Sequence, residues 1–524
     1  MQTAEKKAQK SEGTTRRVPQ AARNVIANWL TYVASGSVSF FLSPFIVRHL
    51  GNSAYGVWVL LVSLTGYLGF LDLGIRGAVT RYVAKFHSEG AHEESSYTVS
   101  SALGLFFTAG ILAVFASVLF AIFAVPHFEI PPAYARAAQI VVVITGLNIA
   151  ISLVSGVFGG VLVGLQRFDL TNSIAVGGIV VRTIAIVLAL KSGYGLITLA
   201  LIQLAGTVGE LGLGATLSRR LYPQVTVALG KLRRSHISLI FSFGFFAFIL
   251  HMSNYLIYYT DALVIGAFLP VSMVTFFSIG SNLTIYARDL VSGFSRIMTP
   301  LASKLEVEGG ISDLRRTSLK GARFCAMAMW PIFVTFIIRG HSFIGLWMGP
   351  SYADLSGHVL WILSIPWLFG VGTSVIASVM LGISKHKRVV PAGVAEGLGN
   401  LALSIALVKS MGIIGVAWGT AIPNLAVSIF FWPWYSRRTL GIPIRDYMRS
   451  LWLLPAATIL PFGICTYLVD RFWPVRTLLL FFVQVAAILP VAFVCIWFLG
   501  LTADERSSFD KWFKSSSRAP HGQS

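Results

Sequence analysis

Two side chains of opposite charge interrupt long apolar runs in the first half of the chain. Arg182 lies in the run 172–190, and Glu210 lies in the next run, 195–217. An arginine in apolar surroundings can bind an anionic group such as a phosphate, and a carboxylate beside it can hold the guanidinium or exchange a proton. Helices formed by consecutive runs are antiparallel, so the two side chains could equally meet as an ion pair that satisfies itself. Both interpretations stay open.

The second half of the chain holds three isolated polar residues in apolar surroundings, His251, Asp261 and Glu396. Each could carry a coupling proton or cation, and each could instead be an ordinary hydrogen-bonded residue between helices. Asp261 falls near the predicted end of a helix, so we expect it to be exposed to solvent.

The sequence lacks the common motifs of enzyme and metal sites. It has no phosphate-binding glycine loop, no dinucleotide fingerprint, no nucleophile elbow, and no H-E-x-x-H, C-x-x-C or D-x-D pair. The three cysteines are scattered and show neither metal spacing nor a disulfide framework. We therefore expect no metal, no cofactor and no enzyme activity, and we leave proton or cation coupling open.

Composition places these residues in a membrane. The chain has 524 residues, of which 55% are hydrophobic and only 12% charged, with a mean hydropathy of +0.74. A soluble protein carries about twice that charged fraction, and runs of about 20 apolar residues cross a bilayer as helices. We predict an all-α polytopic membrane protein with fourteen transmembrane helices, at residues 24–47, 54–72, 99–124, 138–163, 172–190, 195–217, 237–258, 260–283, 321–339, 358–380, 390–408, 413–432, 451–469 and 477–500.

The basic residues give the predicted orientation. With the N-terminus inside, 33 of the 41 Lys and Arg residues lie on the inner side, 7 lie on the outer side, and Arg182 lies within a helix. This asymmetry follows the positive-inside rule, so the net charge of +20 reflects topology and gives no support to nucleic-acid binding. The first 23 residues are polar and basic, which is not the pattern of a secretory signal. Both termini are predicted to be cytoplasmic.

A basic helix is predicted where the second apolar run leaves the membrane on the inner side. Residues 73–86 continue as a helix with one apolar stripe, and Arg81 and Lys85 share another face. Arg76 in this helix and Arg288 in the second half lie closer to the membrane, so they could guide an anionic phosphate. Ordinary anchoring to anionic lipid headgroups is the alternative.

The chain repeats itself at a shift of 218 to 219 residues. The larger shift pairs Thr80 with Thr299, and the smaller shift pairs Gly164 with Gly382. Such matches predict two parallel six-helix bundles related by a pseudo-twofold axis, followed by two additional helices. The predicted divisions are a basic cytoplasmic tail at 1–23, six-helix bundles at 24–235 and 236–450, two additional helices at 451–500, and a cytoplasmic tail at 501–524.

A stripe of small residues recurs every four positions in the fourth apolar run, namely Ser152, Gly156, Gly160 and Gly164. Small residues on one face of a helix let another helix approach closely. We predict that a second helix packs on this stripe.

Two neighbouring segments, "LSPFIVRHLGNSAYGVW" and "GFLDLGIRGAVTRYVAKF", resemble the start of polysaccharide-repeat-unit flippases, the Wzx-type O-antigen and exopolysaccharide exporters. The match comprises the run from Pro44 to Gly51, the pair Tyr55–Gly56, and the Leu-Asp-Leu-Gly-Ile of residues 71–75. Those flippases belong to the multidrug/oligosaccharidyl-lipid/polysaccharide (MOP) superfamily. Its members have two six-helix bundles, which agrees with the predicted helices.

The resemblance implies transport by alternating access. It implies export of undecaprenyl-pyrophosphate-linked oligosaccharide repeat units from the cytoplasmic to the periplasmic leaflet of the bacterial inner (plasma) membrane, for surface polysaccharide biosynthesis. Membrane lipids, a polysaccharide polymerase and export machinery are the implied candidate partners. The central cavity of such proteins is cationic, which suits a pyrophosphate, and Arg182 fits that description by its chemistry.

Two other functions are compatible with the sequence. A cation-coupled multidrug exporter of the same superfamily would share the fold, but it favours an acidic cavity. A membrane-bound polysaccharide polymerase or glycosyltransferase needs large outer loops with catalytic residues. The longest predicted outer loop, 340–357, holds only one histidine and one acidic residue, His341 and Asp354. The sequence does not name the glycan, the pathway, the coupling ion or the oligomeric state.

Overall fold

The computed structural model describes residues 20–385 and 388–507, without the side chains of 20–34, 229, 243–256 and 258. Every regular element within these ranges is a helix, and short 3₁₀ and π segments extend several of them. The α-helices are α2 (Gln20–Gly66), α3 (Ile75–Ser88), α4 (His92–Leu119), α5 (Pro132–Gly164), α6 (Phe168–Lys191), α7 (Leu196–Leu221), α8 (Arg234–Phe268), α9 (Ser272–Ser295), α10 (Met298–Glu308), α11 (Gly310–Trp347), α12 (Pro350–Gly382), α13 (Val389–Ala426), α14 (Trp432–Leu440), α15 (Ile444–Met448), α16 (Leu454–Phe472) and α17 (Leu478–Cys495).

The all-α membrane architecture is confirmed. Within the described residues, ten helical stretches are long and apolar enough to cross a membrane. Two of them, Ser35–Ser88 and Val389–Leu440, each contain two predicted transmembrane segments, which meet at a kink. The kinks lie at Gly51 and Gly412, whose φ angles of 77° and 61° are in the region that favours glycine. Helices α8 and α9 hold the remaining two predicted segments.

Three predicted boundaries were wrong. The break between the seventh and eighth segments was placed at residue 259, whereas α8 runs on to Phe268. The predicted outer loop 340–357 is almost entirely helical, because α11 extends to Trp347 and α12 begins at Pro350. Residues 73–86 do not continue the preceding helix, because Leu73 and Gly74 both have positive φ and α3 begins after them.

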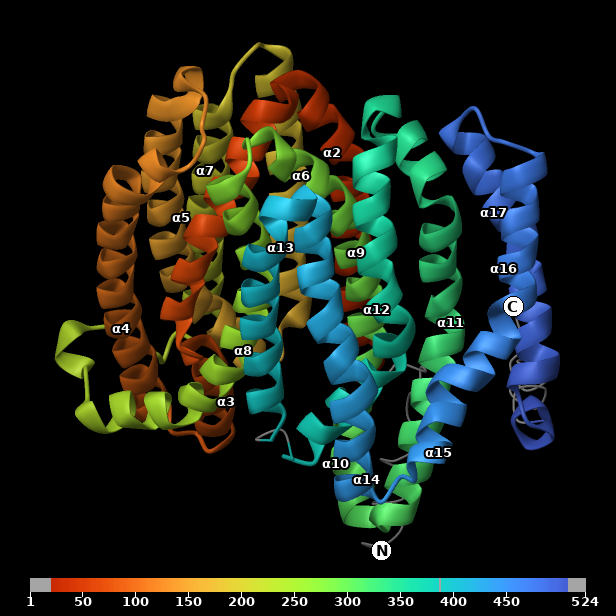
Figure 1. Cartoon of the computed structure of the whole chain (residues 1–524). Coiled ribbons are helices and arrows are strands. Elements are labelled where there is room, and N and C mark those ends of the chain that lie inside the picture. Colours follow the sequence, from red (N-terminus) through yellow and green to blue (C-terminus); the bar gives the residue numbers. More distant parts are fainter. Residues whose placement is uncertain (1–19, 386–387, 508–524) are drawn as a thin grey trace, which may run out of the picture.

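The internal repeat appears in the structure as the same helix packing in both halves. Helix α3 packs on α4 and α5 in the same way that α10 packs on α11 and α12 (Figure 1). A Cβ on Gly164 would lie 3.0 Å from the carbonyl oxygen of Thr80, and a Cβ on Gly382 would collide with the carbonyl oxygen of Thr299. The two glycines are equivalent in the repeat, and so are the two threonines that they contact. Both halves therefore use the same packing between helices.

The small-residue stripe of α5 receives α3, as the pattern predicted. The nearest atoms to a Cβ on Gly160 would belong to Arg76 and Val79 of α3. Helix α3 buries Ile75, Val79 and Phe86, while Arg81 and Lys85 stay exposed.

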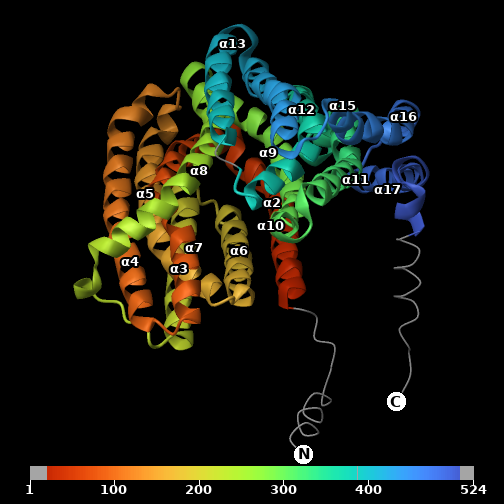
Figure 2. The ribbon, with the colours of Figure 1, turned by 90° about the horizontal axis from the view of Figure 1, so that it is seen from below.

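Helix α8 joins the two halves. It starts beside α3 and α4, where Ile240 is buried in the apolar cluster that also holds Ile75 and Phe106. It then crosses the molecule to pack on α13 (Figure 2). The additional helices α16 and α17 lie outside this arrangement, against α11.

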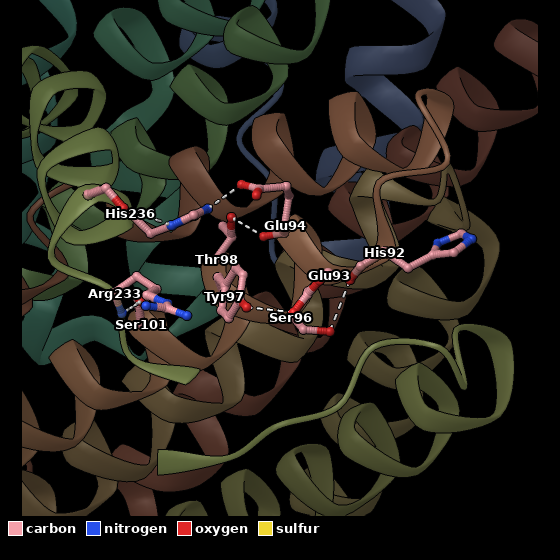
Figure 3. Close-up of polar contacts among 10 residues, drawn as sticks. His92, Glu93, Glu94, Ser96, Tyr97, Thr98, Ser101, Arg233 and His236 are labelled. Atoms are coloured by element: carbon pink, nitrogen blue, oxygen red, sulfur yellow. Dashed lines mark hydrogen bonds and ion pairs between the residues drawn. The ribbon is translucent and has the colours of Figure 1, made fainter. Parts of the chain in front are cut away.

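The linker that precedes α8 is bound to the first turns of α4 (Figure 3). Three linker amides donate hydrogen bonds of 3.1–3.3 Å to serine hydroxyls of α4, namely Thr226 to Ser96, Ala228 to Ser100 and Arg233 to Ser101. At the start of α8, Nε2 of His236 lies 2.9 Å from Oε2 of Glu94. These contacts give partners to three of the buried hydroxyl residues at the start of α4.

Candidate functional site

Arg182 and Glu210 meet, as their positions on consecutive helices predicted. The Nη2 atom of Arg182 donates to Oε1 of Glu210 between α6 and α7. Only 18% of the Arg182 side chain and 28% of the Glu210 side chain are exposed. Two glycines make room for the pair, because a Cβ on Gly178 would lie 2.6 Å from Oε1 of Glu210 and a Cβ on Gly206 would collide with Nε of Arg182. The Nε atom of Arg182 is buried and has no hydrogen-bond partner among the described residues.

Arg76 lies on the small-residue stripe rather than beside Arg182. Its guanidinium packs on Gly156, where a Cβ would lie 2.5 Å from Nε, and its Nη2 lies 3.4 Å from the carbonyl oxygen of Ser152. Nε is 3.6 Å from Oδ2 of Asp72. The side chain is 49% exposed, so it can still reach an anionic group outside the bundle.

Arg288 lies on α9, in the second half. Its Nη2 is 3.3 Å from Oδ1 of Asp289, and 20% of its side chain is exposed. Asp289 lines a pocket of about 540 Å³ that also contains Ser39, Phe40 and Tyr286, between α2 and α9. The structure therefore brings Arg182 and Glu210 together, and it places Arg76 and Arg288 on other helices.

Glu396 is bound by a neighbouring amide. Nδ2 of Asn424 donates to its Oε1 at 2.7 Å, across the two arms of the kinked helix α13. The side chain of His251, the other predicted coupling candidate, lies outside the described residues.

Asp261 contradicts its predicted exposure. It is only 7% exposed, because α8 continues past it to Phe268 and buries it against α13. Thr420 donates to its Oδ2 at 2.9 Å, and Nδ2 of Asn400 lies 3.2 Å from the Thr420 hydroxyl. Oδ1 of Asp261 is buried without a hydrogen-bond partner among the described residues.

Further polar contacts extend from Asn400. Ser404 donates to Oδ1 of Asn400 at 3.1 Å, and its hydroxyl is 3.5 Å from the carbonyl oxygen of Val416. A buried carboxylate beside a hydroxyl can bind a proton or a small hard cation. Sequence reasoning missed this group, because Asp261 on α8 and Thr420 on α13 are 159 residues apart in the chain.

The two halves are in close contact at the membrane end that carries the Gly51 kink, which we call the Gly51 end. There a Cβ on Gly56 would collide with the carbonyl oxygen of Val271, and Thr275 donates to the carbonyl oxygen of Asn52 at 2.7 Å. The Tyr352 hydroxyl donates to Oδ1 of Asn52. The opposite end carries α3 and α10, and we call it the α3 end (Figure 1).

Stacked rings add to the contact between the halves. The rings of Phe40 in α2 and Trp347 in α11 stack with centroids 4.9 Å apart. Nε1 of Trp347 also donates to the carbonyl oxygen of Phe40 at 3.0 Å. Aromatic stacking with a satisfied indole N–H makes a firm contact between helices.

Arg339 also differs from its predicted place in an outer loop, since its side chain is completely buried. Nε donates to Oδ1 of Asp470 at 3.0 Å, and Nη2 donates to Oε1 of Gln484 at 2.6 Å. These bonds attach α11 to α16 and α17, so Arg339 holds the additional helices in place.

Comparison with known proteins gives a family and a fold. The model of the family described as "Polysaccharide biosynthesis protein" matches residues 21–306. The chain is 20% identical to the uncharacterized membrane protein EpsK of Bacillus subtilis, over 84% of this chain and 88% of that one. It is 20% identical to a putative O-antigen transporter of Shigella flexneri, over 75% of this chain and 93% of that one.

A solved structure shares the fold across the whole molecule. It is that of the lipid II flippase MurJ in an inward closed conformation, with a TM-score of 0.71 and 16% identity. The match covers 95% of this chain and 100% of that one. The predicted all-helical transporter-type fold is thus confirmed.

Proposed function

The chain belongs to the polysaccharide biosynthesis protein family, and we propose that it moves lipid-linked oligosaccharides across the membrane by alternating access. The names of its relatives support transport, since one is a putative O-antigen transporter and the structural neighbour is a lipid II flippase. On this proposal the chain is a carrier and performs no covalent chemistry.

The close contact between the halves at the Gly51 end is the observation that carries the proposal. A carrier with two repeated bundles exposes its central site to one side at a time, and a closed end on one side is what this cycle requires. The positive-inside rule puts the α3 end in the cytoplasm, because the predicted inner segments, which include α3 and α10, carry 33 of the 41 Lys and Arg residues. The structure then corresponds to a state closed toward the outside. We place the protein in the bacterial inner membrane, with both termini cytoplasmic.

The proposed substrate is an oligosaccharide on undecaprenyl pyrophosphate. A pyrophosphate needs cationic partners in a low-dielectric site, and arginine forks are suited to phosphate oxygens. Arg182 is the proposed principal contact, since 18% of its side chain is exposed and a phosphate could replace Glu210 as the partner of Nη2. Arg76 and Arg288 are proposed to guide the phosphates toward it. The lipid carrier, membrane lipids and a downstream polysaccharide polymerase are the proposed partners.

Coupling is proposed to occur at Asp261 rather than at Glu210, His251 or Glu396. Asp261 on α8 is buried, with its Oδ2 bound to the Thr420 hydroxyl and its Oδ1 without a partner among the described residues, and Asn400 on the other arm of α13 contacts the same hydroxyl. Binding of a proton or small cation at this carboxylate would draw these helices together. Glu396 and Glu210 already have partners, Asn424 and Arg182.

Reconstitution tests the proposal. The purified chain is placed in liposomes that contain a polyprenyl-pyrophosphate-linked disaccharide with a fluorescent sugar, and dithionite added outside reports the exposed fraction. We expect the protein to transfer the protected fraction to the outer surface within minutes, while protein-free liposomes keep it protected. Equal protection in both would sink the proposal, and efflux of a cationic dye without lipid flipping would favour a multidrug exporter.

A further inference from the structure

Two histidines and an aspartate meet at the tip of the α11–α12 hairpin, at the Gly51 end. They are His341 near the end of α11, and Asp354 and His358, one turn apart near the start of α12. One ligand atom from each residue lies within 4.8 Å of the others. The geometry points to a binding site for a divalent ion of the zinc class, held by these three side chains.

The distances already suit such an ion. Nε2 of His341 lies 3.2 Å from Nδ1 of His358, and that Nδ1 lies 3.3 Å from Oδ1 of Asp354. Ligand atoms about 2.0–2.1 Å from a tetrahedral zinc ion are about 3.3 Å apart, so two edges of the tetrahedron are present. The third edge joins Nε2 of His341 to Oδ1 of Asp354. It needs only a rotation of the Asp354 side chain, which is 84% exposed.

The backbone of α12 is shaped to admit the His341 ring. A Cβ on Gly357 would lie 2.6 Å from Cδ2 of that ring and 2.8 Å from its Cγ. Any larger residue would therefore push His341 away from His358. Gly345 of α11 packs on Ala353, where a Cβ would lie 3.3 Å away, and this contact brings the two helices together.

A single proton does not satisfy the group well. Nδ1 of His358 faces three polar atoms, because the carbonyl oxygen of Asp354 is 2.9 Å away in addition to Nε2 of His341 and Oδ1 of Asp354. One N–H can donate well to only one of them. An ion bound to both imidazoles and the carboxylate satisfies all three side chains together and leaves a fourth position for water.

The donor set selects the class of ion. Two imidazole nitrogens with one carboxylate suit Zn²⁺, Co²⁺, Ni²⁺ or Cu²⁺, whereas Mg²⁺ and Ca²⁺ prefer sites made of oxygen. The bound ion would fasten the end of α11 to α12 two residues beyond Tyr352, which contacts Asn52 of the first half. It would thereby stiffen the part of the second half that closes the Gly51 end. This inference does not depend on what the protein transports.

Cobalt and zinc titrations of the full-length protein, with any affinity tag removed and after chelator treatment, test the site. Co²⁺ should bind at one equivalent with the visible absorption of a tetrahedral nitrogen–oxygen site, and Zn²⁺ should displace it while Mg²⁺ and Ca²⁺ should not. His341→Gln and His358→Gln should each weaken binding at least tenfold. His127→Gln is the matched control, because among the described residues that histidine contacts only the Phe123 carbonyl of its own helical turn.

A stability measurement keeps the test valid if a variant folds poorly. Zn²⁺ should raise the melting temperature of the wild type and of His127→Gln, and it should leave the His341→Gln variant unchanged. Absence of a stoichiometric Co²⁺ site in the wild type would overturn the inference. So would binding that is equal in the wild type and in both cluster variants.

Discussion

Nη2 of Arg182 in α6 donates to Oε1 of Glu210 in α7, and most of both side chains is buried. The pair neutralises two charges within the membrane, which allows both to be there. It also blocks one edge of the guanidinium, so a substrate phosphate has to compete with the carboxylate. The pair is therefore the best place to separate a structural role from a substrate role.

We predict that Arg182→Ala lowers flipping at least tenfold and lowers stability by about 2 kcal/mol, because Glu210 is left as an unpaired buried charge. The double variant Arg182→Ala/Glu210→Ala removes both charges and should recover the stability but not the flipping. Melting temperature and the liposome assay measure the two effects separately. Wild-type flipping in the double variant would show that Arg182 is only a structural partner.

The glycine contact that both halves repeat predicts a graded series of stability losses when the glycines are replaced by alanine. Gly382→Ala should destabilise the protein by about 1–3 kcal/mol, because its Cβ meets the Thr299 carbonyl. Gly164→Ala should lower the free energy of unfolding by less, since the Thr80 carbonyl oxygen is 3.0 Å from the new Cβ. Gly159→Ala in α5 is the control, because no atom lies within 4 Å of its Cβ position. Thermal unfolding in detergent measures the order, and a control as unstable as Gly382→Ala would contradict this packing scheme.

Asp261→Asn keeps the shape of the side chain and removes its charge. We predict that flipping in this variant loses its dependence on the proton or sodium gradient and falls to the uncoupled rate. Asp169→Asn is the control, since Asp169 pairs with Arg167 at the start of α6. Liposomes with imposed pH or Na⁺ gradients make the comparison. A gradient response in Asp261→Asn equal to that of the wild type would remove Asp261 from the coupling step.

We predict that the ion pairs of Glu505, near the C-terminal end, make the stability of the protein depend on pH. Burial raises the pKa of its carboxyl, but the Thr502 amide, Arg323 and Lys320 outweigh this and leave the pKa below its ordinary value. A lowered pKa stabilises the folded state above the pKa of the unfolded chain, about 4.3, and the gain is lost as pH falls through the folded-state value.

The wild type should therefore be more stable than Glu505→Gln by about 1 kcal/mol at pH 7, and the difference should shrink below about pH 4. Melting temperatures across the pH range measure it, with Glu306→Gln as a control on the exposed face of α10. A difference that grows on acidification would contradict the assigned ion pairs.

Much of this arrangement could be predicted from the sequence, because the hydropathy of a membrane helix is a strong local signal. The Arg182–Glu210 contact followed from two charges at matching depth on consecutive antiparallel helices. Thr80 matches Thr299 and Gly164 matches Gly382 because the two halves share one contact, in which α3 packs on α5 and α10 packs on α12.

Two of the three boundary errors arose because α8 and α11 continue past the residue at which the sequence placed their ends, and the third arose because Leu73 and Gly74 break the helix before α3. The end of α8 was placed at a polar residue near Asp261, yet the turn lies at Pro270. The repeat itself contained the correct signal, since a shift of 219 places Gly51, the first kink, on Pro270. Groups assembled from distant segments, such as Asp261 with Asn400 and Thr420, needed the structure.

Cross-linking at the Gly51 end tests the central claim most directly. In a background that lacks the three native cysteines, Asn52→Cys and Tyr352→Cys are joined by a short bis-methanethiosulfonate reagent, which forms a reducible disulfide with each thiol and releases methanesulfinate. Flipping of the fluorescent lipid-linked disaccharide is measured before and after reduction. An alternating-access flippase should be active before cross-linking, lose at least nine-tenths of its activity when the Gly51 end is locked, and recover on reduction. Flipping that continues unchanged in the fully cross-linked protein would contradict the account.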